Sequence, residues 1–333
     1  MTNYLSYSQA ILEGFKYLLD NHKEVFVIGQ GLWSPWYVGN SMKDLDKIYG
    51  KNRIIDTPVS ENAVTGAAIG ASLCGAKPIV VHPRMDFMLY AMDPLINQAA
   101  KWSYMSGGQI NPQVTVRSIV NRGGEQGAQH SQLLHSLFAH IPGLRVVMPY
   151  SVSDARDLLI SSVLCEDPVI YIDDRWLYDE KEIIQDLKVL DLKKEKPKKV
   201  LIGEDLTIIA SGYSTKLAKE AIKKFKGRYT NKSIELIDMR IISPLDASII
   251  IESVEKTRNM IVIDGGWKTC GFASEIISSV TETINPKVLE TRPKNISLKN
   301  SPAPSSKKLE DLYYLTSREI YTSIEEIFFQ KGN

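Results

Sequence analysis

Short apolar runs that alternate with helical patterns constrain the fold of this chain more than any other feature of its sequence. Each run is a few residues long, is rich in β-branched side chains and is bounded by turn-forming residues, as in strands buried on both faces. The runs lie at residues 25–28, 78–81, 114–116, 145–148, 169–171, 206–210, 234–238 and 260–264. Their alternation with helices predicts an α/β protein built from largely parallel sheets.

Helical periodicity fills the intervals between these runs. We expect helices at residues 7–20, 63–74, 93–105, 153–165, 215–226, 246–256, 272–284 and 317–330, with Ser153 as the N-cap of the fourth. Residues 181–199 are charged and have little apolar periodicity, which is typical of a linker. The 333 residues are therefore predicted to form two doubly wound domains, at residues 1–180 and 200–333.

The charge balance argues against a polymeric charged partner. Lysine plus arginine number 40 against 39 for aspartate plus glutamate, so no net field attracts nucleic acid or an acidic membrane. No stretch approaches the ~20 apolar residues that span a bilayer. Met1 to Ala10 lack a basic run followed by an apolar core, so we expect a cytoplasmic protein.

The three cysteines, Cys74, Cys165 and Cys270, lack the spacing of a zinc site or a disulfide framework. We interpret them as buried or incidental thiols.

The segment from Asp56 to Ala71 is the most informative local motif. An expected strand at residues 53–57 ends at Pro58 and leads directly into a helix rich in glycine and alanine. Glu61 lies at the start of that helix, where a carboxylate offsets the helix dipole, and this is its simplest interpretation. The alternative is functional, because open α/β sheets bind ligands at the carboxyl ends of their parallel strands. The residues alone favour the first interpretation and leave the second open.

A glycine-rich loop at residues 123–132 carries His130 after an expected strand. Loops at this edge of a sheet often hold catalytic groups, and a histidine there can act as an acid or base near neutral pH. His130, His135 and His140 recur every five residues, which does not place them on one helical face. A metal cluster is therefore not expected.

Two further motifs carry less chemistry. Gly29-Gln30-Gly31 follows the first strand but lacks the third glycine of a dinucleotide-binding loop, and no helix is expected to begin there. Asp173-Asp174-Arg175 could bring paired carboxylates to a cleft, but we interpret it as a solvated, salt-bridged turn.

Taken in order, the segments of this chain resemble the beta subunit of the decarboxylase component of pyruvate and branched-chain 2-oxo acid dehydrogenases, which is related to the second half of transketolase. The resemblance runs from about residue 4 to residue 330. The matching segments are residues 53–58, 60–61, 66–70, 86–87, 91–93, 97–101, 104–108, 129–132, 140–144, 146–149, 237–240, 244–246 and 253–257.

The resemblance implies that the first domain binds the aminopyrimidine end of thiamine diphosphate. It implies that Glu61 hydrogen-bonds a nitrogen of the pyrimidine ring, that Phe87 packs against that ring and that Val59 lines it through its backbone. His130 would lie near the reacting centre, where it could stabilise an intermediate or guide acyl transfer. An alpha subunit would supply the diphosphate and Mg²⁺ site in an α2β2 heterotetramer. This agrees with the lack of a Gly-Asp-Gly followed by Asn in this sequence, and no metal ligand is assigned to the chain.

The activity that the resemblance implies is decarboxylation of a 2-oxo acid, with transfer of the acyl group to a lipoyl acyltransferase. A first alternative is a split transketolase-like or carboligating subunit that acts on a sugar or aldehyde without a lipoyl partner. A second alternative is a non-catalytic structural or regulatory subunit, against which the presence of both Glu61 and His130 argues.

The chain departs from the family pattern at three places. Gln30-Gly31 replaces a common acidic residue after the first strand, and Asp264-Gly265-Gly266-Trp267 replaces Asp-Glu-Gly-Trp. The segment Val81-His82-Pro83-Arg84 replaces an aromatic or acidic pair shortly before Phe87. His82 and Arg84, as a basic pair, would suit an anionic or phosphorylated substrate, or equally a salt bridge to the alpha subunit.

Overall fold

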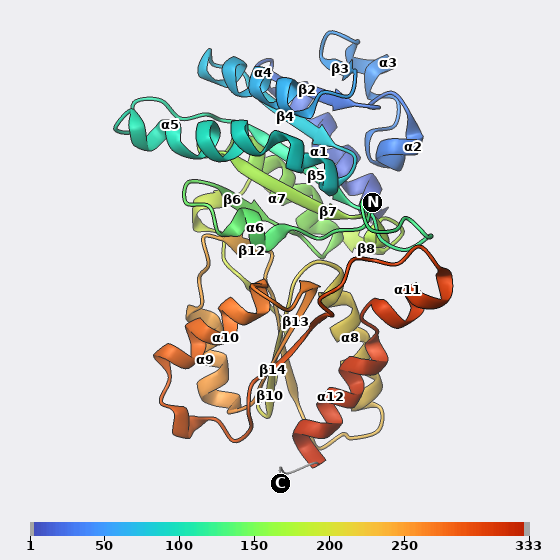
Figure 1. Ribbon diagram of the computed structural model, residues 1–333, viewed down its shortest axis with the longest axis vertical. Coiled ribbons are helices and arrows are strands. Elements are labelled where there is room, and N and C mark those ends of the chain that lie inside the picture. The colour runs from blue at the N-terminus through green and yellow to red at the C-terminus, as the bar shows by residue number, and fades with distance from the viewer. Residues whose placement is uncertain (1–2, 330–333) are drawn as a thin grey trace. The chain divides into compact units, whose positions relative to one another are not determined.

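A computed structural model describes residues 3–329 and confirms an α/β protein with two parallel-sheet units (Figure 1). The first unit contains the residues up to Arg122, together with Gln129–Glu195 and Ile242–Pro244. The second unit contains Gly123–Ala128, Lys196–Ile241 and the residues from Leu245 onwards.

The main sheet of the first unit has seven strands in the order β12-β6-β7-β5-β4-β2-β3, and the neighbours from β6 to β3 run parallel. Every residue of β5 and of β7 is buried, which explains why these strands read as continuous runs rather than as an alternation. The strands are β2 (Val25–Gln30), β3 (Ile54–Thr57), β4 (Lys77–His82), β5 (Thr115–Val120), β6 (Arg145–Val147), β7 (Val169–Asp174) and β12 (Ile241–Ser243).

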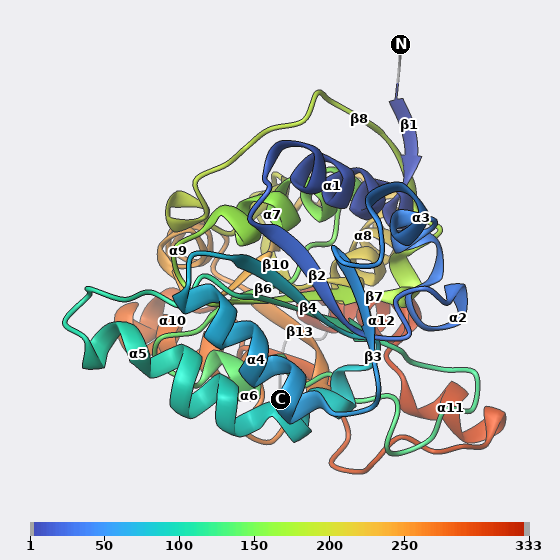
Figure 2. The ribbon, with the colours of Figure 1, turned by 90° about the horizontal axis from the view of Figure 1, so that it is seen from above.

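Helices cover both faces of this sheet, as expected of a doubly wound unit. Figure 2 shows α1 (Tyr7–Asn21) and α7 (Val152–Leu164) on one face, and α4 (Glu61–Leu73) and α5 (Ala100–Met105) on the other. Helix α1 begins at a capping box, in which the Ser6 side chain accepts from the backbone N–H of Gln9 while the Gln9 side chain accepts from the backbone N–H of Ser6. Helices therefore shield the apolar strands from water on both sides.

Two helix predictions need correction. The N-cap of α7 is Ser151, whose hydroxyl accepts from the backbone N–H of Asp154, so Ser153 lies inside the helix. The helix expected at residues 93–105 begins instead with a π-helical segment, η3 (Pro94–Ala99), before α5.

The stretch predicted as a linker contains regular structure. Strand β8 (Lys181–Ile184) pairs antiparallel with β1 (Asn3–Ser6), and a short 3-10 turn, η5, follows at Leu192–Lys194.

The second unit has a five-stranded sheet in the order β14-β13-β10-β11-β9, with β9 antiparallel to β11 and the other pairs parallel. The strands are β9 (Lys198–Leu201), β10 (Leu206–Ala210), β11 (Ile234–Asp238), β13 (Met260–Trp267) and β14 (Lys294–Leu298). The helices are α8 (Tyr213–Lys226), α9 (Ser248–Thr257), α10 (Phe272–Thr283), α11 (Lys307–Tyr313) and α12 (Ser317–Phe329). Gln330, the expected end of the last helix, lies outside the described residues. Among residues 3–329, no helix has the length and apolar character to cross a membrane.

Candidate active site

A depression that opens to solvent lies at the carboxyl ends of β2, β3 and β4. Its position follows from the topology, because β3 and β4 pair with opposite edges of β2, and open sheets bind ligands where the strand order reverses. Its lining combines apolar and polar side chains: Gly29, Gln30, Thr57, Pro58, Ser60, Glu61, Val64, Val81, His82, Pro83 and Phe87.

Glu61 is the first residue of α4 and lines this depression. Its side chain is half-buried, and no side chain or backbone group within residues 3–329 makes a hydrogen bond or ion pair with its carboxylate. The Thr57 hydroxyl, which also faces the depression, is buried without a hydrogen-bond partner. A buried polar group without a partner is costly, so these two groups are suited to a ligand that can donate and accept hydrogen bonds.

Phe87 and His130 come together at one side of the depression. Phe87 lies in η2 (Met85–Ala91), and the His130 ring meets it edge to face with the ring centroids 5.3 Å apart. The buried Asp86 carboxylate fixes the chain beyond His130, because its Oδ1 accepts from the backbone N–H of Gln132 at 3.1 Å and from its side-chain amide at 2.8 Å. Burial raises the pKa of Asp86 above its usual range, and these hydrogen bonds offset only part of that rise. Sequence reasoning assigned no role to Asp86 or Gln132.

Val59 stands apart from the other predicted site residues. Its side chain is 69% exposed and is not part of the lining, although its neighbours Pro58 and Ser60 are. This arrangement is compatible with a contribution through the backbone, and the role of Val59 stays a prediction.

His82 does not form a basic pair with Arg84. Its ring is 3% exposed and lies 3.3 Å from the Thr65 hydroxyl, and burial lowers its pKa to about 4. His82 is therefore uncharged at neutral pH and forms part of the floor of the depression. Arg84 lies instead in an adjacent pocket with Arg175, and Pro83 lines both pockets.

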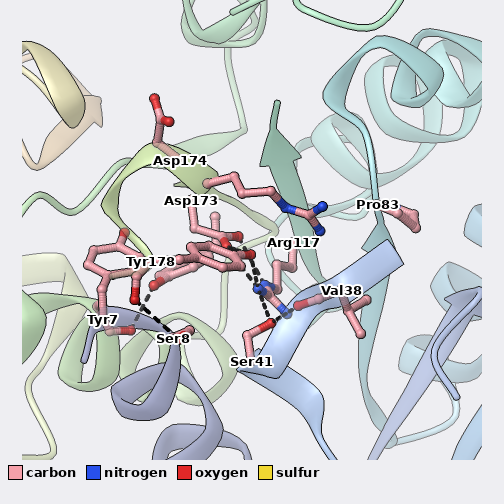
Figure 3. A network of polar contacts seen from close by, with 12 residues as sticks. Tyr7, Ser8, Val38, Ser41, Pro83, Arg117, Asp173, Asp174 and Tyr178 are labelled. Atoms are coloured by element: carbon pink, nitrogen blue, oxygen red, sulfur yellow. Dashed lines mark hydrogen bonds and ion pairs between the residues drawn. The ribbon is translucent and has the colours of Figure 1, made fainter. Parts of the chain in front are cut away.

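The carboxylates of Asp173 and Asp174 do not lie in a solvated turn, which corrects that interpretation. Both are buried at the end of β7 (Figure 3). Arg117 donates to both oxygens of Asp173 at 2.9 and 2.8 Å, and also to the hydroxyls of Ser41 and Tyr178. Asp174 pairs with Arg122. This network joins β5 and β7 to the segment after β2 that carries Ser41, so it fixes the scaffold on which the pockets are built.

The structure places the three cysteines, which were interpreted as buried or incidental thiols, in two different environments. Cys165 is buried, as predicted, and burial raises the pKa of its thiol, but Cys74 and Cys270 are exposed. All three are free.

Comparison with known families accounts for both units. The family described as the pyrimidine binding domain of transketolase matches residues 3–180, and the family described as the C-terminal domain of transketolase matches residues 196–320. The chain is also similar to a solved structure of a split-gene transketolase, an inactive beta4 tetramer, with a TM-score of 0.75 and 18% identity over 98% of this chain and 99% of that one.

Two named proteins are similar in sequence to this chain along nearly its whole length. The beta subunit of acetoin:2,6-dichlorophenolindophenol oxidoreductase from Bacillus subtilis is 33% identical over 98% of each chain. The mitochondrial pyruvate dehydrogenase E1 component subunit beta of Saccharomyces cerevisiae is 33% identical over 93% of this chain and 85% of its own. The chain therefore belongs to the family of transketolase-related beta subunits that includes those of the pyruvate dehydrogenase E1 component and of acetoin oxidoreductase.

Proposed function

We propose that this chain is the beta subunit of a thiamine diphosphate-dependent enzyme that decarboxylates a 2-oxo acid and transfers the acyl group to a lipoyl acyltransferase. The observation that carries the proposal is Glu61, a half-buried carboxylate without a partner within residues 3–329, in a depression walled by Phe87 and apolar side chains. In this reading Glu61 and His130 are the catalytic residues, and Val59, Glu61 and Phe87 contact the cofactor.

The residues of the depression fit an aminopyrimidine. Phe87, Val64 and Val81 provide apolar walls for a flat ring, while the Thr57 hydroxyl and the Glu61 carboxylate can hydrogen-bond to its edge. Because His82 is uncharged at neutral pH, it places no cation beside Glu61 that would compete for the carboxylate.

Each of these side chains has a separate task in the proposed reaction. Glu61 would share a proton with a nitrogen of the bound ring, and the N-terminus of α4 favours the negative charge that its carboxylate carries once that proton lies on the ring. When bound, the cofactor would supply the electron sink for decarboxylation. His130, held against Phe87, would donate a hydrogen bond to the substrate oxygen and guide acyl transfer.

An alpha subunit would complete the site. The sequence lacks the Gly-Asp-Gly and Asn pattern that holds Mg²⁺ and the diphosphate, so these contacts would come from the partner in an α2β2 heterotetramer. The names of relatives as beta subunits support a partner chain.

A carboligating or transketolase-like reaction is the second candidate. Two observations favour it: the relatives include acetoin oxidoreductase beta subunits at the same identity as a pyruvate dehydrogenase subunit, and Arg84 and Arg175 line a pocket beside the depression.

The test is to co-express the chain with its alpha subunit and to compare Glu61→Gln with Glu275→Gln. Glu275 is an exposed carboxylate in the first turn of α10, so it shares the helix-end environment of Glu61 without the depression. We expect Glu61→Gln to abolish turnover across a panel of 2-oxo acids and aldehydes, with Glu275→Gln behaving as the wild type. Full turnover in Glu61→Gln would show that Glu61 is only a helix-end charge.

A further inference from the structure

The pocket that contains Arg84 lies beside the depression and is built by the same sheet. Its volume is about 360 Å³. It is lined by Trp36 and Tyr37 after β2, Pro83 and Arg84 after β4, Asn121 after β5, and Arg175 after β7, together with Ser34. The side-chain amide of Asn121 donates to the Pro83 carbonyl at 2.9 Å, which positions the backbone that carries Arg84. All these residues belong to the first unit.

The two guanidinium groups in this pocket have few partners. Within residues 3–329, Arg84 forms no ion pair or side-chain hydrogen bond, and its Nη1 is buried without a partner. Arg175 donates to the backbone carbonyls of Trp36 and Tyr37, but its Nε is also buried without a partner. Donors therefore remain available on both side chains.

The nearby carboxylates offset only part of the charge of this pair, since burial and Arg175 outweigh the effect of Asp86 on the pKa of Arg84. Asp174 is engaged by Arg122, and Asp86 accepts from Gln132. Burial lowers the pKa of Arg84, and the positive charge of Arg175 lowers it further. Two partly buried cations that repel each other are a cost to the fold, and a bound anion would remove that cost.

We propose that Arg84 and Arg175 bind the phosphate group of a small-molecule substrate or acceptor. This inference rests on the proposed function, because it assigns the pocket to the molecule that reacts in the depression. A phosphate monoester carries about two negative charges at pH 7 and several acceptor oxygens, which matches two guanidinium groups with unused donors. Pro83 lines both pockets, so a substrate anchored by its phosphate would lie beside the cofactor ring proposed for the depression.

The test is equilibrium binding of glycerol 3-phosphate to the full chain by calorimetry, for the wild type, Arg84→Gln, Arg84→Lys and Arg292→Gln. Arg292 is an exposed arginine in the second unit and serves as the matched control. We expect saturable binding that Arg84→Gln weakens about tenfold or more, as for the loss of a charge-assisted hydrogen bond. Arg84→Lys should bind more tightly than Arg84→Gln, and Arg292→Gln should bind as the wild type.

Further ligands identify the source of the phosphate. In the complex with the alpha subunit, thiamine diphosphate binding should be unchanged in Arg84→Gln, and acetate should compete poorly with glycerol 3-phosphate for the wild type. If Arg84→Gln weakened thiamine diphosphate instead, the pocket would be a cofactor anchor, and if acetate competed equally, it would be a carboxylate site. Either result, or undetectable phosphate binding, overturns the inference. The proposed function is tested separately, because it depends on Glu61 and on turnover.

Discussion

Replacement of Arg117 by methionine tests how strongly the buried network at the ends of β5 and β7 supports the site. Arg117 and Asp173 are both 0% exposed, and the change removes the paired hydrogen bonds to Asp173 together with those to Ser41 and Tyr178. Asp173 would keep only the hydrogen bond from the Tyr178 hydroxyl among these contacts, at 2.6 Å. Removal of one partner of a buried pair costs about 3–5 kcal/mol, because the other charge is left buried and uncompensated.

This cost should be measurable in the free energy of unfolding of the first unit. Four of the five tryptophans lie in that unit, so tryptophan fluorescence during urea unfolding at pH 7 reports mainly on it. A loss of about 4 kcal/mol corresponds to a fall in melting temperature of roughly 8–16 °C for a unit of this size. Most of the loss should be recovered in the double variant Arg117→Met/Asp173→Leu, since no charge is then stranded.

The pair formed by Arg145 and Asp167, which is partly exposed, provides the control. Its side chains are 17% and 31% exposed, so Arg145→Met should cost no more than about 1 kcal/mol. The reasoning fails if Arg117→Met costs no more than Arg145→Met. It also fails if the double variant is as unstable as the single one, because the stranded charge would then not be the cause.

Two histidines give the remaining predictions. Burial holds the pKa of His82 at about 4, against ~6.5 in an unfolded chain, so the unfolded state takes up the proton first as pH falls. The stability associated with neutral His82 is therefore fully present above pH ~6.5. The free energy of unfolding falls by up to about 3 kcal/mol as the pH is lowered from ~6.5 to 4. The urea midpoint of His82→Phe should therefore change less with pH than that of the wild type between pH 4 and ~6.5. An equal dependence of the midpoint on pH in both proteins would contradict a buried, neutral His82. In the complete enzyme, His130→Ala should retain cofactor binding and slow acyl transfer by about 10²- to 10⁴-fold, measured by single-turnover kinetics; unchanged transfer would remove His130 from the chemistry.

The strands show how far apolar patterns can predict the fold. The runs at residues 114–116 and 169–171 correctly located β5 and β7, but both strands continue, to Val120 and Asp174. The pattern stopped early because the continuations contain charged residues, Arg117 and Asp173 among them. These residues are tolerated in a buried strand because they neutralise each other across 56 positions of sequence, a pairing that no local pattern reveals.

Local sequence patterns were equally unable to decide the roles of residues in the candidate site. Position along the chain allowed Glu61 to be a helix-dipole residue as readily as a ligand-binding one, and family resemblance favoured the second role. The structure adds the observation that its carboxylate is half-buried without a partner within residues 3–329. Arg175 was missed as a pocket residue because it follows two aspartates, which suggested local ion pairs. Those aspartates are instead engaged by Arg117 and Arg122, so Arg175 is left to face Arg84.

The contrast between His82 and Arg84 explains how one short segment can serve two different pockets. Had the strand continued, residues two apart would point to the same face and would form the expected basic pair. Strand β4 ends at His82, however, and η2 begins at Met85, so Pro83 and Arg84 lie in the turn between them. His82 stays in the interior and loses its charge, whereas Arg84 keeps a charge that burial and Arg175 disfavour. The depression is thus lined without a charged cation while the neighbouring pocket holds two, a separation that suits the proposed neutral ring on one side of Pro83 and the proposed anion on the other.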